Sequence, residues 1–188
     1  MIKIYTDGSA AKNRSGWGYV IVFPDKTIDI HNGTVPNATN QQMELTAVLN
    51  ALNQWKEQLA QEHDVTIYTD SAYVYNCYEQ QWYKIWDDNG WRNSKGEDVA
   101  NQELWIKLIP FFETPGVFIQ KVKGHSGNIY NDIADKLACG VYNEEQNLTN
   151  EKINDTINIK LSEILIEYKM DKLTVNNTIK KIIEVFNG

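Results

Sequence analysis

A chain of 188 residues is long enough for one well-packed core and a small accessory element. Its composition, 42% hydrophobic and 23% charged, is that of a soluble globular protein, and no apolar run approaches the roughly 18–20 residues that a membrane span needs. The net charge of −7 argues against a simple polycationic nucleic-acid binder, because proteins that bind polyanions usually present basic surface.

The opening residues alternate like a strand from residue 2 onward, so we expect no signal or transit peptide. Cys77 and Cys139 are the only cysteines and do not lie at the spacing of a zinc site. Two isolated thiols favour a reducing compartment, with the thiols buried as small hydrophobic groups. We therefore expect a cytoplasmic protein that makes no membrane contact.

Composition divides the chain near residue 147. All six tryptophans lie in residues 1–147, which also hold 12 Lys/Arg and 19 Asp/Glu, whereas residues 148–188 hold six of each charge sign. The acidity therefore belongs to the first region. We expect one domain over 1–147 and a separate extension over 148–188.

Three strands and a helix are predicted first. Residues 2–6 alternate, residues 18–23 are β-branched and aromatic, and residues 27–30 follow a turn signal at 24–26. An amphipathic helix follows the polar stretch 37–40. Its apolar face consists of Leu45, Val48, Leu52, Trp55 and Leu59.

Strands and helices then alternate. Residues 65–69 form a compact strand with Asp70-Ser71 at its end, followed by a helical stretch, and residues 117–122 form a fifth strand. A loop at 123–128 leads into a helix whose apolar face consists of Ile133, Leu137, Ala138 and Val141. Three meandering strands followed by strand–helix units predict an α/β fold with a mixed five-stranded sheet flanked by helices.

Residues 148–188 have the pattern of a helical hairpin. One apolar stripe runs through residues 153–168 and a second through residues 175–186, with Thr174 as a candidate N-cap. About 40 residues cannot bury both stripes alone. We expect the extension to dock on the first region or to mediate self-association, and folding on another partner is the third alternative.

Two acids are associated with predicted strands: Asp7 lies on the first strand, just before Gly8-Ser9, and Asp70 lies at the end of the fourth strand. If these strands are neighbours, the carboxylates lie side by side at the sheet edge where ligands bind. Divalent cations would then relieve their repulsion and lower their raised pKa values. The alternative is that each acid caps a following helix.

Other acids lie on predicted helices. Glu44 falls in the first turn of the first helix, where a carboxylate also complements the helix dipole. Asp132 and Asp135 share one face of the last helix of the first region, and Asp135 lies off its apolar stripe. Taken one at a time, each of these acids can also be explained as a solvated residue on the surface of its helix. A site with only oxygen ligands would select Mg²⁺ or Mn²⁺.

Several segments together resemble one family. Tyr-Thr-Asp-Gly-Ser at 5–9, Thr-Asn-Gln-Gln-Met-Glu-Leu at 39–45, Tyr-Thr-Asp-Ser at 68–71 and Val-Lys-Gly-His-Ser-Gly at 122–127 are similar to the signature segments of type 1 ribonuclease H, and Ala-Asp-Lys-Leu-Ala at 134–138 closes the set. The resemblance covers roughly residues 1–143. It implies a ribonuclease H-like sheet, with four metal-binding carboxylates at Asp7, Glu44, Asp70 and Asp135 and the family's loop histidine at His125.

The resemblance also implies an activity, which is endonucleolytic hydrolysis of the RNA strand of RNA–DNA hybrids. Two Mg²⁺ ions about 4 Å apart would flank the scissile phosphate, and the products would carry 5′-phosphate and 3′-hydroxyl ends. His125 would assist proton transfer or the release of product and metal, because its imidazole titrates near neutrality. Asp132 would assist the site from outside the set of metal ligands, without binding metal itself, or it would remain a solvated residue.

By the same resemblance, three groups of residues would contact the hybrid. Minor-groove contacts would come from Asn13, Asn40 and Gln41, a DNA phosphate pocket from Thr39 and Asn101, and an aromatic channel for the DNA strand from Tyr73, Trp82 and Trp86. Trp82 and Trp86 are also four residues apart, as in a buried helix stripe, so core packing is the alternative for them. Ala72 stands where the family often carries a polar or longer residue, which argues against one of the minor-groove contacts.

Bacterial relatives often carry a lysine-rich protrusion between the tryptophans. Here residues 87–98 have its length but contain two cations and four anions. This segment, which we call the acidic handle, predicts weak phosphate binding.

Two other functions compete with this one. A catalytically silent scaffold would have lost at least one acid, and all four are present. A junction resolvase or integrase shares the carboxylates, but the segment at 39–44 and the handle tryptophans favour hybrid cleavage.

Overall fold

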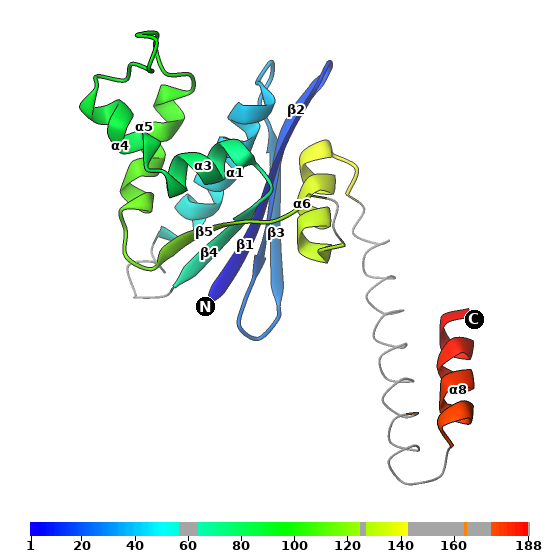
Figure 1. Ribbon diagram of the computed structural model, residues 1–188. Helices are drawn as coiled ribbons and strands as arrows, with labels where there is room; N and C mark the ends of the chain where they lie inside the picture. Colours follow the sequence, from blue (N-terminus) through cyan, green and yellow to red (C-terminus); the bar gives the residue numbers. More distant parts are fainter. Residues whose placement is uncertain (57–63, 125–126, 143–163, 165–173, 188) are drawn as a thin grey trace. The chain divides into compact units, whose positions relative to one another are not determined.

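The computed structural model describes residues 1–56, 64–124, 127–142, 164 and 174–187 (Figure 1). The chain forms two compact units, Met1–Tyr142 and Asn143–Gly188. The domain boundary predicted at 147/148 falls outside the described residues.

The first unit contains a five-stranded sheet with the order β3-β2-β1-β4-β5. Its strands are β1 (Ile2–Ala11), β2 (Arg14–Val22), β3 (Ile28–Thr34), β4 (Val65–Thr69) and β5 (Val117–Lys121). The β1–β2 and β2–β3 pairs are antiparallel, whereas β4 pairs in parallel with both β1 and β5. The predicted mixed five-stranded sheet is confirmed.

The first hairpin is longer than predicted. β1 and β2 stay paired to Ala11 and Arg14, well beyond the predicted ends at residues 6 and 18. Apart from Trp17, the residues of this stretch are small or polar, so apolar alternation could not reveal it, yet their backbone groups complete the ladder. Asp7, which the sequence already places on the first strand, therefore lies well inside that strand.

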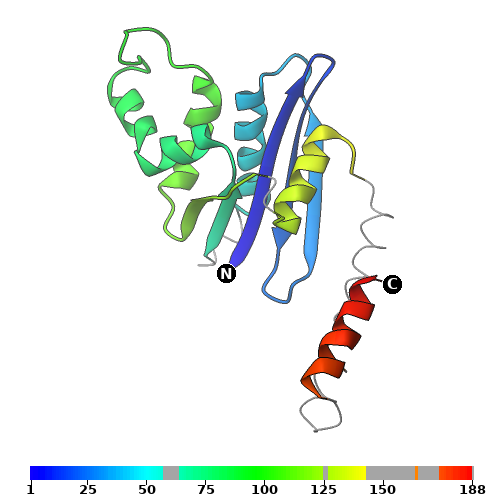
Figure 2. The same ribbon diagram turned by 45° about the vertical axis from the view of Figure 1, so that its right-hand side comes forward.

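Helices cover both faces of the sheet. The first unit contains α1 (Asn40–Gln54), α3 (Ala72–Glu79), α4 (Trp82–Asp88), α5 (Gln102–Phe112) and α6 (Ile129–Cys139). Figures 1 and 2 show α1 on one face and α6 on the other. The larger hydrophobic core lies on the α1 side, around Leu52, Ile67 and Trp105, and a smaller core lies under α6, around Val20 and Leu137.

The predicted helix faces are largely confirmed. Leu45, Val48 and Leu52 of α1 are fully buried, whereas Leu59 lies outside the described residues. The prediction was wrong for Val141, because α6 ends at Cys139 and Gly140 adopts the left-handed C-cap conformation. Val141 consequently lies beyond the helix and is 69% exposed.

In the second unit, α8 (Val175–Asn187) corresponds to the second predicted helix. The hydroxyl of Thr174 accepts a hydrogen bond from the Asn177 backbone N–H at 3.4 Å, as expected of an N-cap. The first predicted helix, over residues 153–168, lies outside the described residues except for Ile164. No helix in the described part of the chain is long and apolar enough to cross a membrane.

Candidate metal centre

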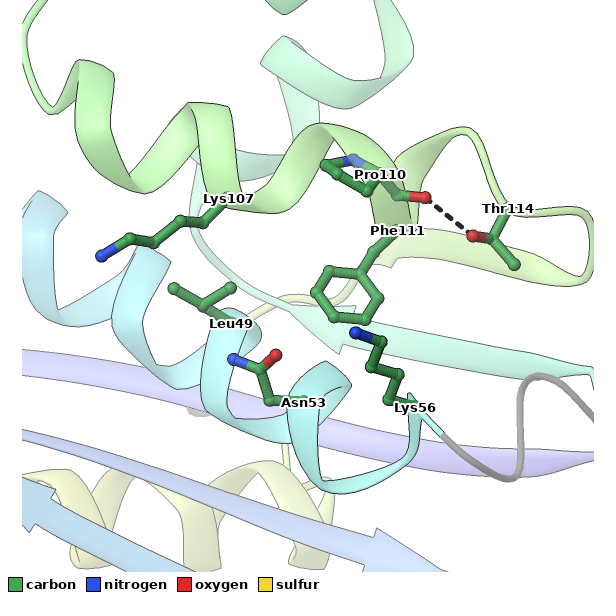
Figure 3. A pocket seen from close by; sticks show the side chains of 7 residues that line it. All are labelled: Leu49, Asn53, Lys56, Lys107, Pro110, Phe111 and Thr114. Atoms are coloured by element: carbon green, nitrogen blue, oxygen red, sulfur yellow. Dashed lines mark hydrogen bonds between the residues drawn. The ribbon is translucent and has the colours of Figure 1, made fainter.

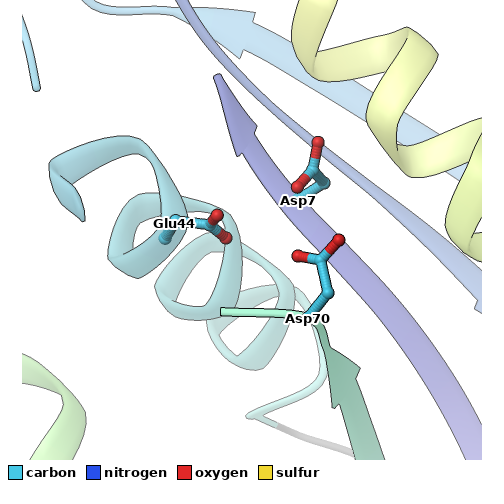
Figure 4. A group of neighbouring side chains, drawn as sticks. All are labelled: Asp7, Glu44 and Asp70. Carbon is cyan, nitrogen blue, oxygen red and sulfur yellow. The ribbon is translucent and has the colours of Figure 1, made fainter. Parts of the chain in front are cut away.

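Three carboxylates meet where β4 ends (Figure 4). In the parallel register of β1 and β4, Thr6 is the partner of Thr69, so the next residues, Asp7 and Asp70, lie side by side. Asp7, Glu44 and Asp70 each offer a carboxylate oxygen, and these oxygens lie within 4.8 Å of one another. The predicted juxtaposition of Asp7 and Asp70 therefore exists, with Glu44 as its third member.

Glu44 reaches this place because α1 packs directly on β1. A Cβ atom at Gly8 would overlap the backbone of Met43 and Glu44, so only glycine permits this approach. Helix α1 begins at Asn40 and has no acid in its first turn, so the sequence-based placement of Glu44 in that turn was wrong. Glu44 is only 6% exposed, and its side chain faces the sheet edge rather than solvent.

The helix-capping alternative is wrong for both strand acids. Asp7 lies within β1 and precedes no helix. Helix α3 is capped by Ser71 instead of Asp70, because the Ser71 hydroxyl accepts a hydrogen bond from the Val74 backbone N–H at 3.4 Å. Helix capping therefore explains the position of neither carboxylate.

The site strongly disfavours carboxylate charge. Burial, followed by the charges of Asp70 and Asp135, raises the pKa of Asp7 to about 7. Burial, followed by the charges of Asp7 and Asp70, raises the pKa of Glu44 to about 9. The buried Oε2 of Glu44 has no hydrogen-bond partner among the described residues. Clustered oxygen ligands, excess negative charge and an unsatisfied carboxylate oxygen fit a hard divalent cation.

Asp135 approaches the three-acid cluster from α6, which lies on the opposite face of the sheet from α1. Its side chain forms a hydrogen bond with Asp7. The Cys139 thiol lies 3.6 Å from Asp135 Oδ1 and 3.4 Å from the Ser9 hydroxyl. Asp135 is thus adjacent to Asp7 but is not one of the three acids within 4.8 Å of one another. Asp132 lies in the first turn of α6, where its charge complements the helix dipole.

The loop after β5 contacts the site. A Cβ atom at Gly124 would lie 2.6 Å from Asp70 Oδ2, so the loop backbone passes directly over this carboxylate. The predicted His125 lies outside the described residues. Sequence reasoning missed the steric roles of Gly8 and Gly124, although both glycines lie inside the segments that carried the family resemblance.

The predicted minor-groove residues are exposed. Asn13 lies in the turn between β1 and β2, and Asn40 and Gln41 begin α1. The Asn40 side-chain oxygen accepts a hydrogen bond from the Ala10 backbone N–H at 3.1 Å, which ties α1 to the hairpin. Thr39 is the N-cap of α1 and forms a capping box with Gln42.

The predicted channel residues also pack against the core. The Tyr73 hydroxyl accepts a hydrogen bond from Trp105 Nε1 at 2.9 Å, and the Trp86 and Trp105 rings lie 5.8 Å apart. Trp82 and Trp86 are half-buried against the larger core, so core packing accounts for part of both rings. Asn101 precedes α5 in the left-handed conformation, and its side chain makes no capping bond.

The acidic handle is internally bonded. Asp87 accepts a hydrogen bond from Trp91 Nε1 at 3.1 Å, which gives this acid a structural role that the sequence did not reveal. Arg92 forms an ion pair with Asp98 at 3.0 Å across an isolated β-bridge. One of the two handle cations is therefore already paired within the protein.

Comparisons with known proteins agree with one another. The family model described as RNase H matches residues 1–142. A protein named Ribonuclease H from Syntrophomonas wolfei is 44% identical over 139 residues, which are 73% of this chain and 92% of that protein. A second protein named Ribonuclease H, from Moorella thermoacetica, is 41% identical over 139 residues, which are 73% of this chain and 88% of that protein.

Solved structures show the same fold. The solution structure of the PFV RNase H domain is similar with a TM-score of 0.62 and 28% identity, over 74% of this chain and 93% of that one. A foamy viral protease-reverse transcriptase in complex with RNA/DNA hybrid is similar with a TM-score of 0.64 and 25% identity, over 74% of this chain and 20% of that one.

Proposed function

Since this chain belongs to the ribonuclease H family, we propose that it is an endonuclease that hydrolyses the RNA strand of RNA–DNA hybrids. The products would carry 5′-phosphate and 3′-hydroxyl ends. The single observation that carries the proposal is the cluster of Asp7, Glu44 and Asp70, whose carboxylate oxygens lie within 4.8 Å of one another. A similar reverse transcriptase has been solved with such a hybrid, which supports this choice of substrate.

We propose that Asp7, Glu44, Asp70 and Asp135 hold two divalent cations, with Mg²⁺ as the physiological ion. Bound ions of this kind supply acidity to a water molecule and neutralise charge on the phosphate. Asp7 is the central ligand, because it adjoins Asp70 on one side and is hydrogen-bonded to Asp135 on the other. Asp7 and Glu44, whose pKa values are raised, must lose their protons when a cation binds.

Other residues would act on the substrate. We propose that His125, which follows Gly124 and thus comes directly after the backbone that touches Asp70, moves a proton or aids product release. The exposed Asn13, Asn40 and Gln41 would contact base edges and ribose 2′-hydroxyls. A DNA phosphate would lie against Thr39 and Asn101, and the backbone of that strand against Tyr73, Trp82 and Trp86.

Cleavage of an end-labelled RNA–DNA hybrid with Mg²⁺, with Mn²⁺ and with chelator tests the proposal. We expect metal-dependent cuts within the RNA strand and no cleavage of DNA duplex, RNA duplex or four-way junction. Kinase labelling of the fragments, with and without prior phosphatase treatment, identifies the new 5′ ends. A 5′-phosphate made by cleavage blocks labelling until phosphatase has removed it. Junction cleavage would favour a resolvase, and binding of hybrid without cleavage would favour a silent scaffold.

A further inference from the structure

A pocket lies between α1 and α5, and none of the four carboxylates lines it (Figure 3). Its volume is about 450 Å³, which lies in the range of small-molecule sites. Helix α1 contributes Leu49 and Asn53, with Lys56 just beyond its end. Helix α5 contributes Lys107, Pro110 and Phe111.

The floor of this pocket is apolar and firmly held. Leu49 and Phe111 are 8% and 9% exposed, and both belong to the larger hydrophobic core. Pro110 extends the apolar surface along α5. The hydroxyl of Thr114, at the rim, already donates to the Pro110 carbonyl at 2.7 Å, so its proton is engaged within the protein. The floor therefore offers a rigid surface to an apolar group.

The rim of the pocket is cationic. Lys56 and Lys107 are exposed and stand at opposite ends of the pocket, with Leu49 between them (Figure 3). Neither lysine forms an ion pair with any residue that the structure describes. Two such ammonium groups beside an apolar floor are distinctive in a chain of net charge −7. No described residue neutralises these two ammonium groups, so an anionic ligand could pair with them.

We propose that this pocket binds a small organic anion with a flat apolar body, such as an aryl carboxylate or sulfonate. The apolar body would lie on Leu49 and Phe111, and the anionic group would lie within reach of Lys56 or Lys107. The amide of Asn53 would supply a further hydrogen bond to the anion. This site is independent of the carboxylate centre and of the nuclease activity proposed for it.

Calorimetric titration of the full chain with naphthalene-2-sulfonate tests the proposal. Two related compounds test the apolar body and the anionic group of the ligand separately. We expect one molecule bound per chain. Methanesulfonate, which lacks the apolar body, and naphthalene-2-sulfonamide, which lacks the charge, should bind at least about tenfold more weakly. Equal binding of the neutral sulfonamide would overturn the role of the lysines.

A double variant locates the site. Lys56→Glu with Lys107→Glu should weaken naphthalene-2-sulfonate binding at least about tenfold, because repulsion replaces attraction at both ends. Lys84→Glu with Lys95→Glu is the matched control, since both lysines are exposed and lie outside the pocket. Thermal melting verifies that both variants fold, and the double variant Lys56→Ala with Lys107→Ala repeats the test without introduced charge. Unchanged affinity in both pocket variants would place the ligand elsewhere and overturn the proposal.

Discussion

Replacing Asp7 by Asn should stabilise the metal-free protein at alkaline pH. Without cations, Asp7 shares a buried site with Glu44 and Asp70 and forms a hydrogen bond with Asp135. Folding raises its pKa from 3.8 to about 7, so the folded state favours the protonated form. The resulting stability is fully present below the unfolded pKa and is lost as pH rises through about 7. Asparagine keeps the shape but never acquires the charge.

The magnitude follows from the raised pKa, whose largest cause is burial and whose next causes are the charges of Asp70 and Asp135. A pKa shift of about three units corresponds to about 4 kcal/mol in total, of which about 2–3 kcal/mol is lost between pH 5 and pH 8.5. For a chain of this size, 2–3 kcal/mol corresponds to a melting temperature change of about 5–10 °C.

The assay is thermal unfolding in chelator at pH 5 and at pH 8.5, for the original chain and the variant. The melting temperature of Asp7→Asn minus that of the original chain should be about 5–10 °C larger at pH 8.5 than at pH 5. The pKa of Glu44, about 9, lies above that of Asp7, so the difference between pH 5 and pH 8.5 reports mainly on Asp7. Asp25→Asn is the control, because Asp25 is exposed and hydrogen bonds from Thr27 lower its pKa. That variant should gain nothing at high pH.

Addition of Mg²⁺ at pH 8.5 should make the original chain melt at a higher temperature than Asp7→Asn. The cation binds only the folded carboxylate cluster, which the variant lacks in complete form. An advantage of Asp7→Asn that is the same at both pH values would refute the electrostatic explanation. It would point instead to improved packing or hydrogen bonding by the amide.

Asp70→Asn should lower hybrid cleavage by about three orders of magnitude or more while the fold persists, whereas Asp132→Asn should change it by less than about threefold; single-turnover cleavage distinguishes them. Gly124→Ala should reduce cleavage by about tenfold or more with little change in melting temperature, because its methyl group displaces Asp70 Oδ2, and equal activity would show that the loop yields freely. Asp88→Lys should tighten hybrid binding and steepen its salt dependence if the acidic handle contacts substrate, and binding titrations at several salt concentrations measure this. Asp87→Lys should instead cost stability by removing the acceptor of Trp91 Nε1, as a melting curve would show. A chain ending at residue 147 should retain Mg²⁺-dependent cleavage, and complete loss of activity in a folded product would contradict the proposed division.

The elements of the fold were predictable wherever burial leaves a periodic pattern. The apolar faces of α1 and α6, the strand at 65–69 and the N-cap at Thr174 follow from side-chain spacing. The extension of β1 and β2 to the hairpin tip was not predictable in this way. Backbone pairing holds that stretch, and backbone hydrogen bonds leave no mark on hydropathy.

The sequence by itself determined which acids are candidates for the site, because their residue types and family segments can be identified without coordinates. Only the tertiary structure decided why Glu44 is there. It is a buried ligand candidate rather than a helix-dipole residue, since Gly8 allows α1 to pack onto β1. The same holds for Asp87, which resembles a solvated handle acid in sequence but accepts a hydrogen bond from Trp91 in the fold. The physical reason is common to both cases: the energy of a carboxylate depends on burial and on partners distant in sequence, and neither is encoded at its own position.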